Sequence, residues 1–182
     1  MKRLFPLVVA VVLCLAGAPP RADVCMRVLL RAASFDRNLS DRVGAEATLL
    51  IAYNSRDAES METLRSNQAE RARLSGMRLG GADLKIVEVD LRTMVSWDEE
   101  IESHHPDAVL VLPGTDSWIP AIAEDAVRSG YFTLGHGHEP HGVAISVSLG
   151  ADARPVVTVD RGVAEATGMD LSSQLLRLAV VR

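Results

Sequence analysis

Two continuous runs of apolar residues constrain the fold more than any other feature of this sequence. Residues 47–53 read ATLLIAY and residues 107–113 read DAVLVLP, and Asp107 is the only charged residue in either run. A strand with one face in water alternates apolar and polar residues, whereas a strand covered on both faces is apolar throughout. The two runs therefore predict strands of a parallel sheet that lies between two layers of helices.

Segments with helical periodicity separate these strands. The spacing predicts a helix over 24–35, a mostly polar helix over 57–75 that stops at Gly76, and a helix after residues 113–117 that ends at Gly130. Thr115 or Asp116 is the expected N-cap of that last helix. Further strands are predicted over 84–90 and 131–135. Strands that alternate with helices in this way are typical of a parallel sheet with right-handed crossovers.

The end of the chain follows a different pattern. Residues 142–150 and 154–160 both alternate apolar and polar side chains and are separated by a short turn, which predicts an antiparallel hairpin. Two helical stretches follow, over 161–167 and after Asp170. The predicted fold class is α/β: a three-layer sandwich with a mostly parallel sheet, a C-terminal antiparallel hairpin and closing helices, formed as a single domain by residues 23–182.

Residues 1–22 have the composition of a secretory signal peptide. Lys2 and Arg3 precede an uncharged stretch from Leu4 to Ala18, which is shorter than the roughly 20 residues of a membrane-spanning helix. We therefore expect export to the periplasm and a mature protein that is soluble. Loss of this segment removes three bases and no acids, which changes the net charge from −5 to −8. An acidic surface repels phosphate backbones, so nucleic acid is not an expected partner.

The segment GHGHEPHG, residues 135–142, is a candidate metal site. His136, His138 and His141 lie close enough in the chain for one short segment to present all three imidazoles to zinc, copper or nickel, with Glu139 in reserve. A hydrated loop whose glycines suit a turn explains the same residues. Both interpretations stay open at this stage, and no other cofactor is expected.

A second candidate site follows the apolar strand at 107–113. Thr115, Asp116 and Ser117 come directly after the carboxyl end of that strand, which is where open α/β sheets bind ligands. Helix capping accounts for the same side chains equally well. Trp97 and Trp118 are candidate partner-binding residues, because tryptophan is favoured at binding hot spots, although core packing is the simpler expectation.

No catalytic motif is present in the sequence. It contains no GxSxG nucleophile elbow, no HExxH pair and no Walker loop, so we do not expect an enzyme. Removal of the signal peptide leaves Cys25 as the only cysteine, which excludes an internal disulfide and leaves open a link between two copies of the chain. Binding is the expected activity.

The closing segment TGMDLSSQLLRLAVVR is the most specific text in the sequence. Leu171, Leu175, Leu178 and Ala179 form one apolar face of a predicted helix, and Ser172 can cap it. This segment, the hairpin before it and the short helix around Ala164 and Ala166 resemble the end of the YfiR-like family of small periplasmic proteins. The stretch AVLVLPGTDSWIPAIAEDAVRSGYFTLG is similar to that family's central strand, helix and following strand.

The resemblance implies a periplasmic regulatory protein. Members of the family engage the external domain of a membrane-bound signalling protein, a diguanylate cyclase in the named case, and hold it inactive, so the resemblance implies a repressor in cyclic di-GMP signalling or a partner of a sensor kinase. The family's aromatic-rich first helix is replaced here by residues 24–42, and GHGHEPHG stands in place of a plain glycine-containing loop. The alternative function is a periplasmic protein that binds a transition metal or small solute through the His136 to His141 loop.

Overall fold

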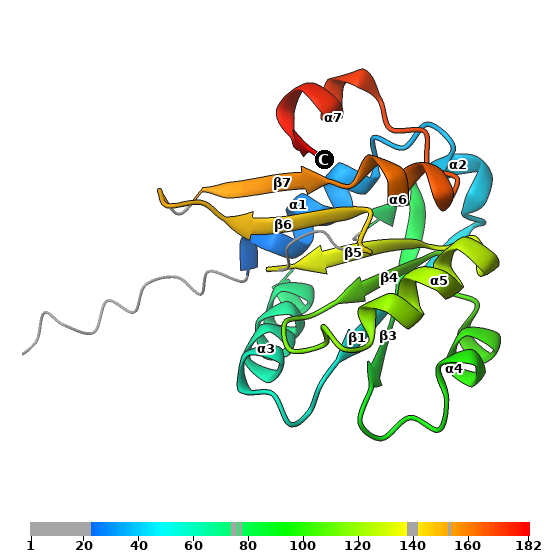
Figure 1. Ribbon diagram of the computed structural model, residues 1–182, viewed down its shortest axis with the longest axis vertical. Helices are drawn as coiled ribbons and strands as arrows, with labels where there is room; N and C mark the ends of the chain where they lie inside the picture. The colour runs from blue at the N-terminus through cyan, green and yellow to red at the C-terminus, as the bar shows by residue number, and fades with distance from the viewer. Residues whose placement is uncertain (1–22, 74–75, 77, 138–141, 153) are drawn as a thin grey trace, which may run out of the picture.

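Helices and strands alternate along the chain and build one eight-stranded sheet with helices on both faces (Figure 1). The computed structural model describes residues 23–73, 76, 78–137, 142–152 and 154–182. The elements, in chain order, are α1 (Asp23–Ala33), α2 (Leu39–Arg42), β1 (Glu46–Tyr53), α3 (Ala58–Arg73), β2 (Arg78–Leu79), β3 (Ala82–Asp90), α4 (Trp97–His104), β4 (Ala108–Val111), α5 (Ile119–Ser129), β5 (Phe132–His136), β6 (Ile145–Leu149), β7 (Pro155–Val159), α6 (Arg161–Ala166), α7 (Ser173–Leu178) and β8 (Val180–Val181).

The strand order determines which loops meet. The order is β2-β3-β1-β4-β5-β6-β7-β8, and β3, β1, β4, β5 and β6 run parallel to one another. β6 and β7 form an antiparallel hairpin. The predicted fold class, with a mostly parallel sheet and an appended hairpin, is therefore confirmed. From β1 the chain crosses to β3 on one side and returns to β4 on the other, which places the topological switch point between β1 and β4.

The two apolar runs lie at the centre of the sheet, as the sequence predicts. β1 and β4 are adjacent in register, with Leu49 beside Ala108 and Ala52 beside Val111. Alternate residues of these strands contribute to two separate hydrophobic clusters. One lies under α1, α3 and α7 and includes Leu49 and Leu110, and the other lies under α4 and α5 and includes Leu50 and Val109. Burial on both faces explains why neither run alternates with polar residues.

Three short elements were not predicted from the sequence. α2 follows α1 after a brief turn, and β2 pairs with the start of β3 through a two-residue turn at Gly80 and Gly81. Both glycines have positive φ, at 61° and 93°, as a tight hairpin turn requires. β8 lies parallel to β7, with Val180 beside Thr158 and Val181 beside Val159. The predicted closing helix is therefore shorter than expected, because its last two valines join the sheet.

The C-terminal segment is fastened to the turn after α1. Asp36, whose side chain is fully buried, accepts hydrogen bonds at Oδ1 from the backbone N–H groups of Asn38 at 3.1 Å and Asp170 at 2.8 Å. Ser172 caps α7 by accepting from Leu175 N at 3.5 Å, as predicted. The expected apolar face is only partly correct: Leu175 is buried, whereas Leu178 is 76% exposed because the helix ends there and turns away from the core.

No helix among the described residues is both long enough and apolar enough to cross a membrane. The predicted signal peptide, residues 1–22, lies outside the described residues, and so does the side chain of Cys25. Export and the state of Cys25 stay predictions.

Candidate functional site

Three loops leave the carboxyl ends of neighbouring strands at the switch point. They follow β1 at Asn54, β4 at Leu112 and β5 at Gly137, and the strand registers place all three at the same edge of the sheet. In open α/β sheets this edge is where ligands bind, because the strand order reverses there and the two flanking loops diverge to opposite faces. We refer to this region as the carboxyl edge.

The loops after β1 and β4 are bonded directly to one another. Asn54 Nδ2 donates a hydrogen bond to the Gly114 carbonyl oxygen at 2.9 Å. Gly114 has a φ of 76°, and a Cβ atom built there would lie 2.3 Å from Cγ of Asp57. Only glycine fits this position, for reasons of both backbone conformation and space. This close approach holds Asp57 against the β4 loop. Asp57 Oδ1 also accepts a hydrogen bond from Ser60 N at 2.8 Å.

The three predicted ligand residues lie at this edge in two different environments. Thr115 is fully buried, and its hydroxyl donates to the Leu112 carbonyl oxygen at 2.7 Å. Asp116 and Ser117 are exposed at the start of the turn that leads into α5. Thr115 therefore shapes the loop, while Asp116 and Ser117 are the side chains that a ligand can reach.

The predicted cap of α5 is wrong. Its N-cap is Trp118, which makes no side-chain capping bond, and Pro120 occupies the first turn as expected. The backbone makes the turn instead, because Trp118 N donates to the Thr115 carbonyl oxygen at 2.9 Å and Ile119 N donates to that of Asp116 at 3.3 Å. The Thr115 hydroxyl donates its hydrogen bond to the Leu112 carbonyl oxygen and does not cap the helix.

The histidine segment begins beside the same loops. His136 is the last residue of β5 and is half-buried, and Gly137 N donates to the Val147 carbonyl oxygen at 2.8 Å. A Cβ atom at Gly137 would lie 3.6 Å from Cγ of Pro113. Where the described chain resumes, a Cβ atom at Gly142 would lie 2.9 Å from Cγ2 of Ile119 in α5. The described residues on either side of the histidine segment, Gly137 and Gly142, therefore lie beside Pro113 and Ile119.

The metal prediction falls largely outside the described residues. His138, Glu139 and His141 are not among them, so the geometry of a three-histidine set is not observed. Within the part of the chain that the structure describes, no group of three or more His, Cys, Asp or Glu side chains is placed to hold a metal ion. His104 and His105 end α4, ahead of the amino end of β4, and so lie at the opposite edge of the sheet from His136.

A carboxylate at the end of β3 organises the loop after β1. Asp90 Oδ1 accepts hydrogen bonds from the backbone N–H groups of Ser55 at 3.2 Å and Arg92 at 3.1 Å. Burial raises the pKa of Asp90, but hydrogen bonds from Ser55, Arg92 and Thr93 lower it by more, so the pKa lies below its ordinary value. Asp90 is therefore an ionised structural group that links the ends of β1 and β3.

The rim of the carboxyl edge carries both signs of charge. Arg56 and Arg92 are exposed, and neither guanidinium forms an ion pair with any residue that the structure describes. Asp116 supplies an exposed carboxylate on the opposite side of the switch point. This arrangement suits a small solute that carries polar groups of both kinds better than it suits a polyanion.

Sequence reasoning did not identify Asn54, Ser55 and Arg56 as site residues. They follow ATLLIAY directly, as Thr115 to Ser117 follow the second apolar run, so the same position rule would have found them. Their relation to the β4 loop depends on the order of the strands in the sheet, which no local pattern specifies.

Trp97 and Trp118 are half-buried against the hydrophobic cluster under α4 and α5. Trp97 Nε1 donates to the Tyr131 hydroxyl at 3.1 Å, and that hydroxyl donates to the Ile122 carbonyl oxygen at 2.9 Å. Burial raises the pKa of Tyr131 above its ordinary value, so the hydroxyl stays protonated and keeps this chain of bonds. Trp97 thus connects α4 to α5, and partner binding by the two tryptophans stays a prediction.

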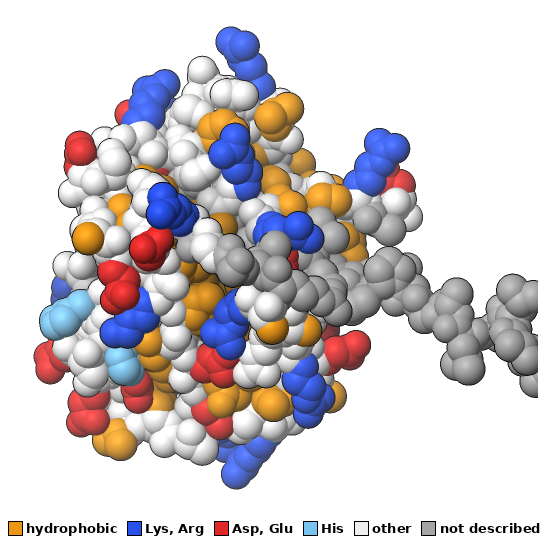
Figure 2. Space-filling model, turned by 180° about the vertical axis from the view of Figure 1, so that it is seen from behind, with side chains coloured by type: hydrophobic (Ala, Val, Ile, Leu, Met, Phe, Trp, Pro, Cys, Tyr) orange, Lys and Arg blue, Asp and Glu red, His pale blue; other side chains and the backbone are white. Residues whose placement is uncertain are grey.

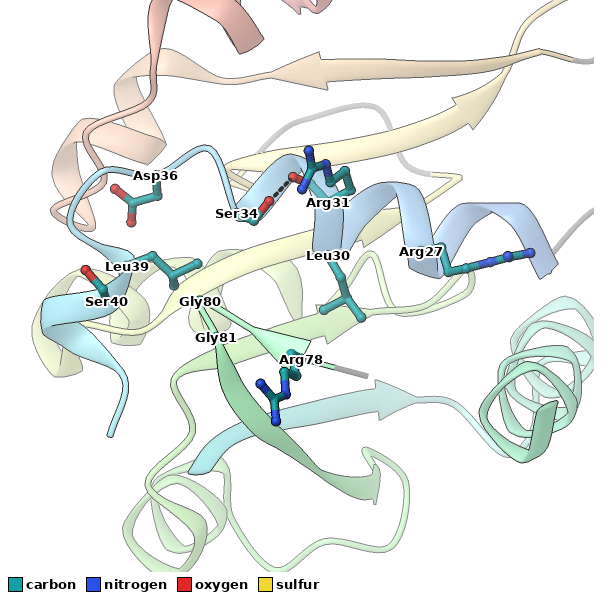
Figure 3. Close-up of a pocket in the computed structure, with 10 residues that line it drawn as sticks. All are labelled: Arg27, Leu30, Arg31, Ser34, Asp36, Leu39, Ser40, Arg78, Gly80 and Gly81. Atoms are coloured by element: carbon teal, nitrogen blue, oxygen red, sulfur yellow. Dashed lines mark hydrogen bonds between the residues drawn. The ribbon is translucent and has the colours of Figure 1, made fainter. Parts of the chain in front are cut away.

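A groove of about 640 Å³ lies between α1 and the β2–β3 hairpin (Figure 3). Arg27, Arg31 and Arg78 line it, but their guanidinium groups point in different directions in Figure 3. Arg27 Nε pairs with buried Glu70 at 2.6 Å and Arg78 Nε pairs with Asp83 at 3.2 Å. The arginines are used within the protein and do not converge on a common point, so we do not assign an anion site there.

Charges of both signs are mixed on the face of the molecule shown in Figure 2. On the face shown in Figure 2, Lys and Arg side chains lie among Asp and Glu side chains and form no continuous basic field. This distribution agrees with the acidic composition, since phosphate backbones are recognised by clustered bases.

Comparisons with known proteins identify the fold and no family. No family model matches the sequence, and no curated protein matches it. An ABC domain from Streptococcus pneumonia, solved in complex with L-Trp, superposes with a TM-score of 0.59 at 12% identity, covering 89% of this chain and 60% of its own. A conserved domain protein from Vibrio cholerae gives a TM-score of 0.55 at 13% identity and covers 90% of this chain and 60% of its own.

The ligand-free, open structure of a substrate-binding protein with adhesive properties from Clostridium difficile is also similar. It gives a TM-score of 0.53 at 12% identity, covering 75% of this chain and 54% of its own. The present chain thus spans little more than half the length of the three structures. At these identities the likeness shows the fold alone: this chain shares an α/β fold with the three structures.

Proposed function

We propose that this protein is a periplasmic binding protein that holds a small polar solute at the carboxyl edge and engages the external domain of a membrane-bound signalling protein. One observation carries the ligand half of the proposal: the loops after β1 and β4 are bonded to one another at the switch point of the sheet, and Gly137, the last described residue after β5, lies beside Pro113. Ligands of doubly wound sheets bind at this edge, and the fold is shared with a substrate-binding protein.

The chemistry of the edge defines the solute. Asp116 and Ser117 offer exposed oxygens, Arg56 and Arg92 offer cations without ion-pair partners in the described residues, and His136 ends the neighbouring strand. A compact zwitterion or hydroxylated solute can use both kinds of group, and free amino acids are the simplest members of that class. The likeness to a domain solved with L-Trp adds support for this choice of test ligands.

The partner half of the proposal rests on the C-terminal resemblance to the YfiR-like family and on the predicted signal peptide, residues 1–22. In this proposal the protein acts as a repressor of a diguanylate cyclase or sensor kinase. Exposed apolar residues near the C-terminus provide a surface for such contacts: Leu178 is 76% exposed, Val180 48% and Val181 43%. No catalytic step is part of the proposal.

The experiment is a calorimetric screen of the mature domain against the free amino acids and small hydroxylated solutes. The proposal expects one member to bind, and expects Ser117→Ala and Asp116→Asn to weaken that binding, with the melting temperature of Ser117→Ala unchanged. Asp41→Asn is the matched control, because Asp41 is exposed on α2 and makes no ion pair in the described chain. Equal loss of affinity in the control, or no heat from any solute, contradicts the ligand half.

A transition-metal function through His136, His138 and His141 is the second candidate. The observation that favours it is that the segment starts at the carboxyl edge, beside Pro113. Titration with zinc, copper or nickel, followed by calorimetry, tests it against a His136→Ala, His138→Ala, His141→Ala variant. His104→Ala with His105→Ala is the control, since those residues lie at the other edge. Absence of heat with all three metals removes this candidate.

A further inference from the structure

Residues 170–182, which include α7 and β8, bury little apolar surface. Leu175 is the one buried side chain of this segment, while Leu171, Leu176 and Ala179 are half-buried and most of the others are exposed. α7 has six residues, which is too few for a helix that is stable on its own in water. We refer to residues 170–182 as the strap, and Figure 1 shows α7 lying beyond β7. Apolar burial does little to hold the strap in place.

Backbone hydrogen bonds hold the first end of the strap. Ser172 N donates to the Phe35 carbonyl oxygen at 3.0 Å, and Arg37 N donates to that of Asp170 at 2.9 Å. Asp170 N donates to Oδ1 of Asp36 at 2.8 Å. All three bonds join the strap to the turn that follows α1.

A second set of backbone bonds holds the other end. Arg182 N donates to the Val159 carbonyl oxygen at 3.0 Å, and Arg161 N donates to that of Arg182 at 3.1 Å. These bonds extend the pairing of β8 with β7. Because the strap is fixed at both ends and the short helix between them does not persist alone, loss of one attachment weakens the other. We therefore expect the strap to detach as a unit.

The first attachment is centred on a buried carboxylate. The side chain of Asp36 is fully buried, and its Oδ1 also accepts from Asn38 N at 3.1 Å. Its Oδ2 lies 3.6 Å from Arg42 Nη1, and neither of these two atoms forms a hydrogen bond with any residue that the structure describes. A buried polar group is costly to leave unpaired, whereas water satisfies it once the junction opens. The junction is therefore favourable when fully closed or fully open, as in a two-state element.

The large apolar side chains that the strap exposes are Leu178, Val180 and Val181, the surface assigned above to the signalling partner. From these contacts we propose that the strap opens and closes as one unit while the rest of the chain stays folded, that Asp36 holds it closed, and that only the closed strap presents this surface. A partner that binds the closed form alone stabilises that form. The role in partner binding rests on the partner half of the proposed function, whereas the opening itself depends on neither partner nor solute.

Native-state amide exchange of the mature domain, followed by NMR in urea below the unfolding transition, tests the opening. The N–H groups of Ser172, Ala179 and Arg182 donate hydrogen bonds near the start, in the middle and at the end of the strap. They should share one protection factor, at least about a hundredfold below that of Leu112, which donates to the Ala52 carbonyl oxygen in the sheet. Protection equal to that of Leu112, or three unrelated protection factors, overturns the proposal.

Asp36→Asn tests the residue that holds the strap closed. The substitution removes the charge of the acceptor and should lower the protection of the strap amides about tenfold. Gly114→Ala is the matched control, because it destabilises the folded chain at the opposite, carboxyl edge of the sheet and makes no contact with the strap. It should leave the protection of the strap amides unchanged. A fall in both variants shows that the strap opens only by global unfolding, and a fall in neither removes the role of Asp36; both results overturn the proposal.

Two leucines of α7 give an equivalent test if Asp36→Asn does not fold. Leu175→Ala removes the one buried side chain of the strap and should lower the protection of Ser172 and Arg182 at least about thirtyfold. Leu178→Ala changes an exposed side chain of the same helix and should leave this protection within about twofold of wild type. Equal effects of the two substitutions overturn the proposal. None of these outcomes bears on solute binding, and a strap that opens as expected in a protein without a signalling partner removes only the partner half.

Discussion

The two edges of the sheet use polar residues in opposite ways. At the amino edge, Thr48 N donates to Asp107 Oδ2 at 2.7 Å, and Asp107 N donates back to the Thr48 carbonyl oxygen at 2.9 Å. Arg42 donates to the Gly130 carbonyl oxygen and lies 5.6 Å from the ring centroid of Phe132. At this edge the polar groups form hydrogen bonds with one another, and these bonds connect the segments that meet there.

At the carboxyl edge, only part of the polar set is used in this way. Asn54, Thr115 and Asp90 fix the loops, while the side chains of Asp116 and Ser117 are exposed. We infer from this difference that the polar residues at the amino edge stabilise the fold. Those at the carboxyl edge form two sets: a supporting set that fixes the loops, and an exposed set that a ligand can reach. Substitutions at the two edges should therefore separate effects on stability from effects on binding.

The largest effect on stability is expected at Asp36, beneath the amino edge. Its fully buried carboxylate accepts from two backbone N–H groups and lies 3.6 Å from Arg42 Nη1. Asp36→Ala removes the acceptor of both N–H groups and the carboxylate beside Arg42. It should lower the free energy of unfolding by about 3–4 kcal/mol. Urea denaturation measures it. Asp36→Asn keeps one acceptor oxygen and should cost less; equal losses in the two variants would contradict this account.

A comparison of two glycines isolates the contact between the loops of the carboxyl edge. Gly114 and Gly130 have nearly the same φ, 76° and 79°, but a Cβ atom meets Asp57 at Gly114 and nothing within 4 Å at Gly130. Gly130→Ala should cost about 1 kcal/mol for the backbone alone. Gly114→Ala should cost about 2–3 kcal/mol, because the clash is added. Equal costs in chemical denaturation would show that the loops can move apart freely.

The pH dependence of stability tests the supporting role of Asp90. Its pKa is lower in the folded protein than in the unfolded chain, so its contribution is fully present above the unfolded value of about 4 and is lost as the pH falls through the folded value. The difference in stability between wild type and Asp90→Asn should be constant from pH 7 to about pH 5 and should shrink below about pH 4. A difference that grows on acidification would reverse the assigned sign.

The smallest effect on stability is expected from the residues assigned to the ligand. Ser117→Ala changes an exposed side chain and should alter the unfolding free energy by less than about 0.5 kcal/mol, measured in the same urea titration. Its effect on solute affinity should nevertheless exceed that of Asp36→Ala in the fraction of protein that remains folded. A large loss of stability in Ser117→Ala would place this residue in the supporting set.

The sequence predicts the layers of the fold better than it predicts the contacts between loops. The apolar runs that became β1 and β4 specify burial on both faces, and the alternation in residues 145–149 and 155–159 specifies a hairpin. These patterns are local and follow directly from side-chain burial. β2 and β8 are too short to leave such a pattern, and β8 forms from valines that also fit a helical face.

The candidate site was predictable only in part. The position of Thr115 to Ser117 after an apolar strand predicted that they lie at the carboxyl edge of the sheet, which is where the structure has them; ligand binding there stays a prediction. The proximity of Gly137 to Pro113 follows from the pairing of Val111 with Gly135, and the bond from Asn54 to Gly114 follows from the pairing of β1 with β4. Both contacts depend on the order of the strands in the sheet, which is a property of the whole fold and cannot be predicted from the sequence of any single segment.

The central claim is that a small polar solute binds at the carboxyl edge, and a chemical-shift map of the mature domain with the solute identified by calorimetry tests it most directly. The account predicts shifts concentrated at Asn54, Asp116 and His136, with Asp107 and His105 at the amino edge unchanged. Shifts concentrated at Asp107 and His105, or spread evenly over both edges, would contradict it.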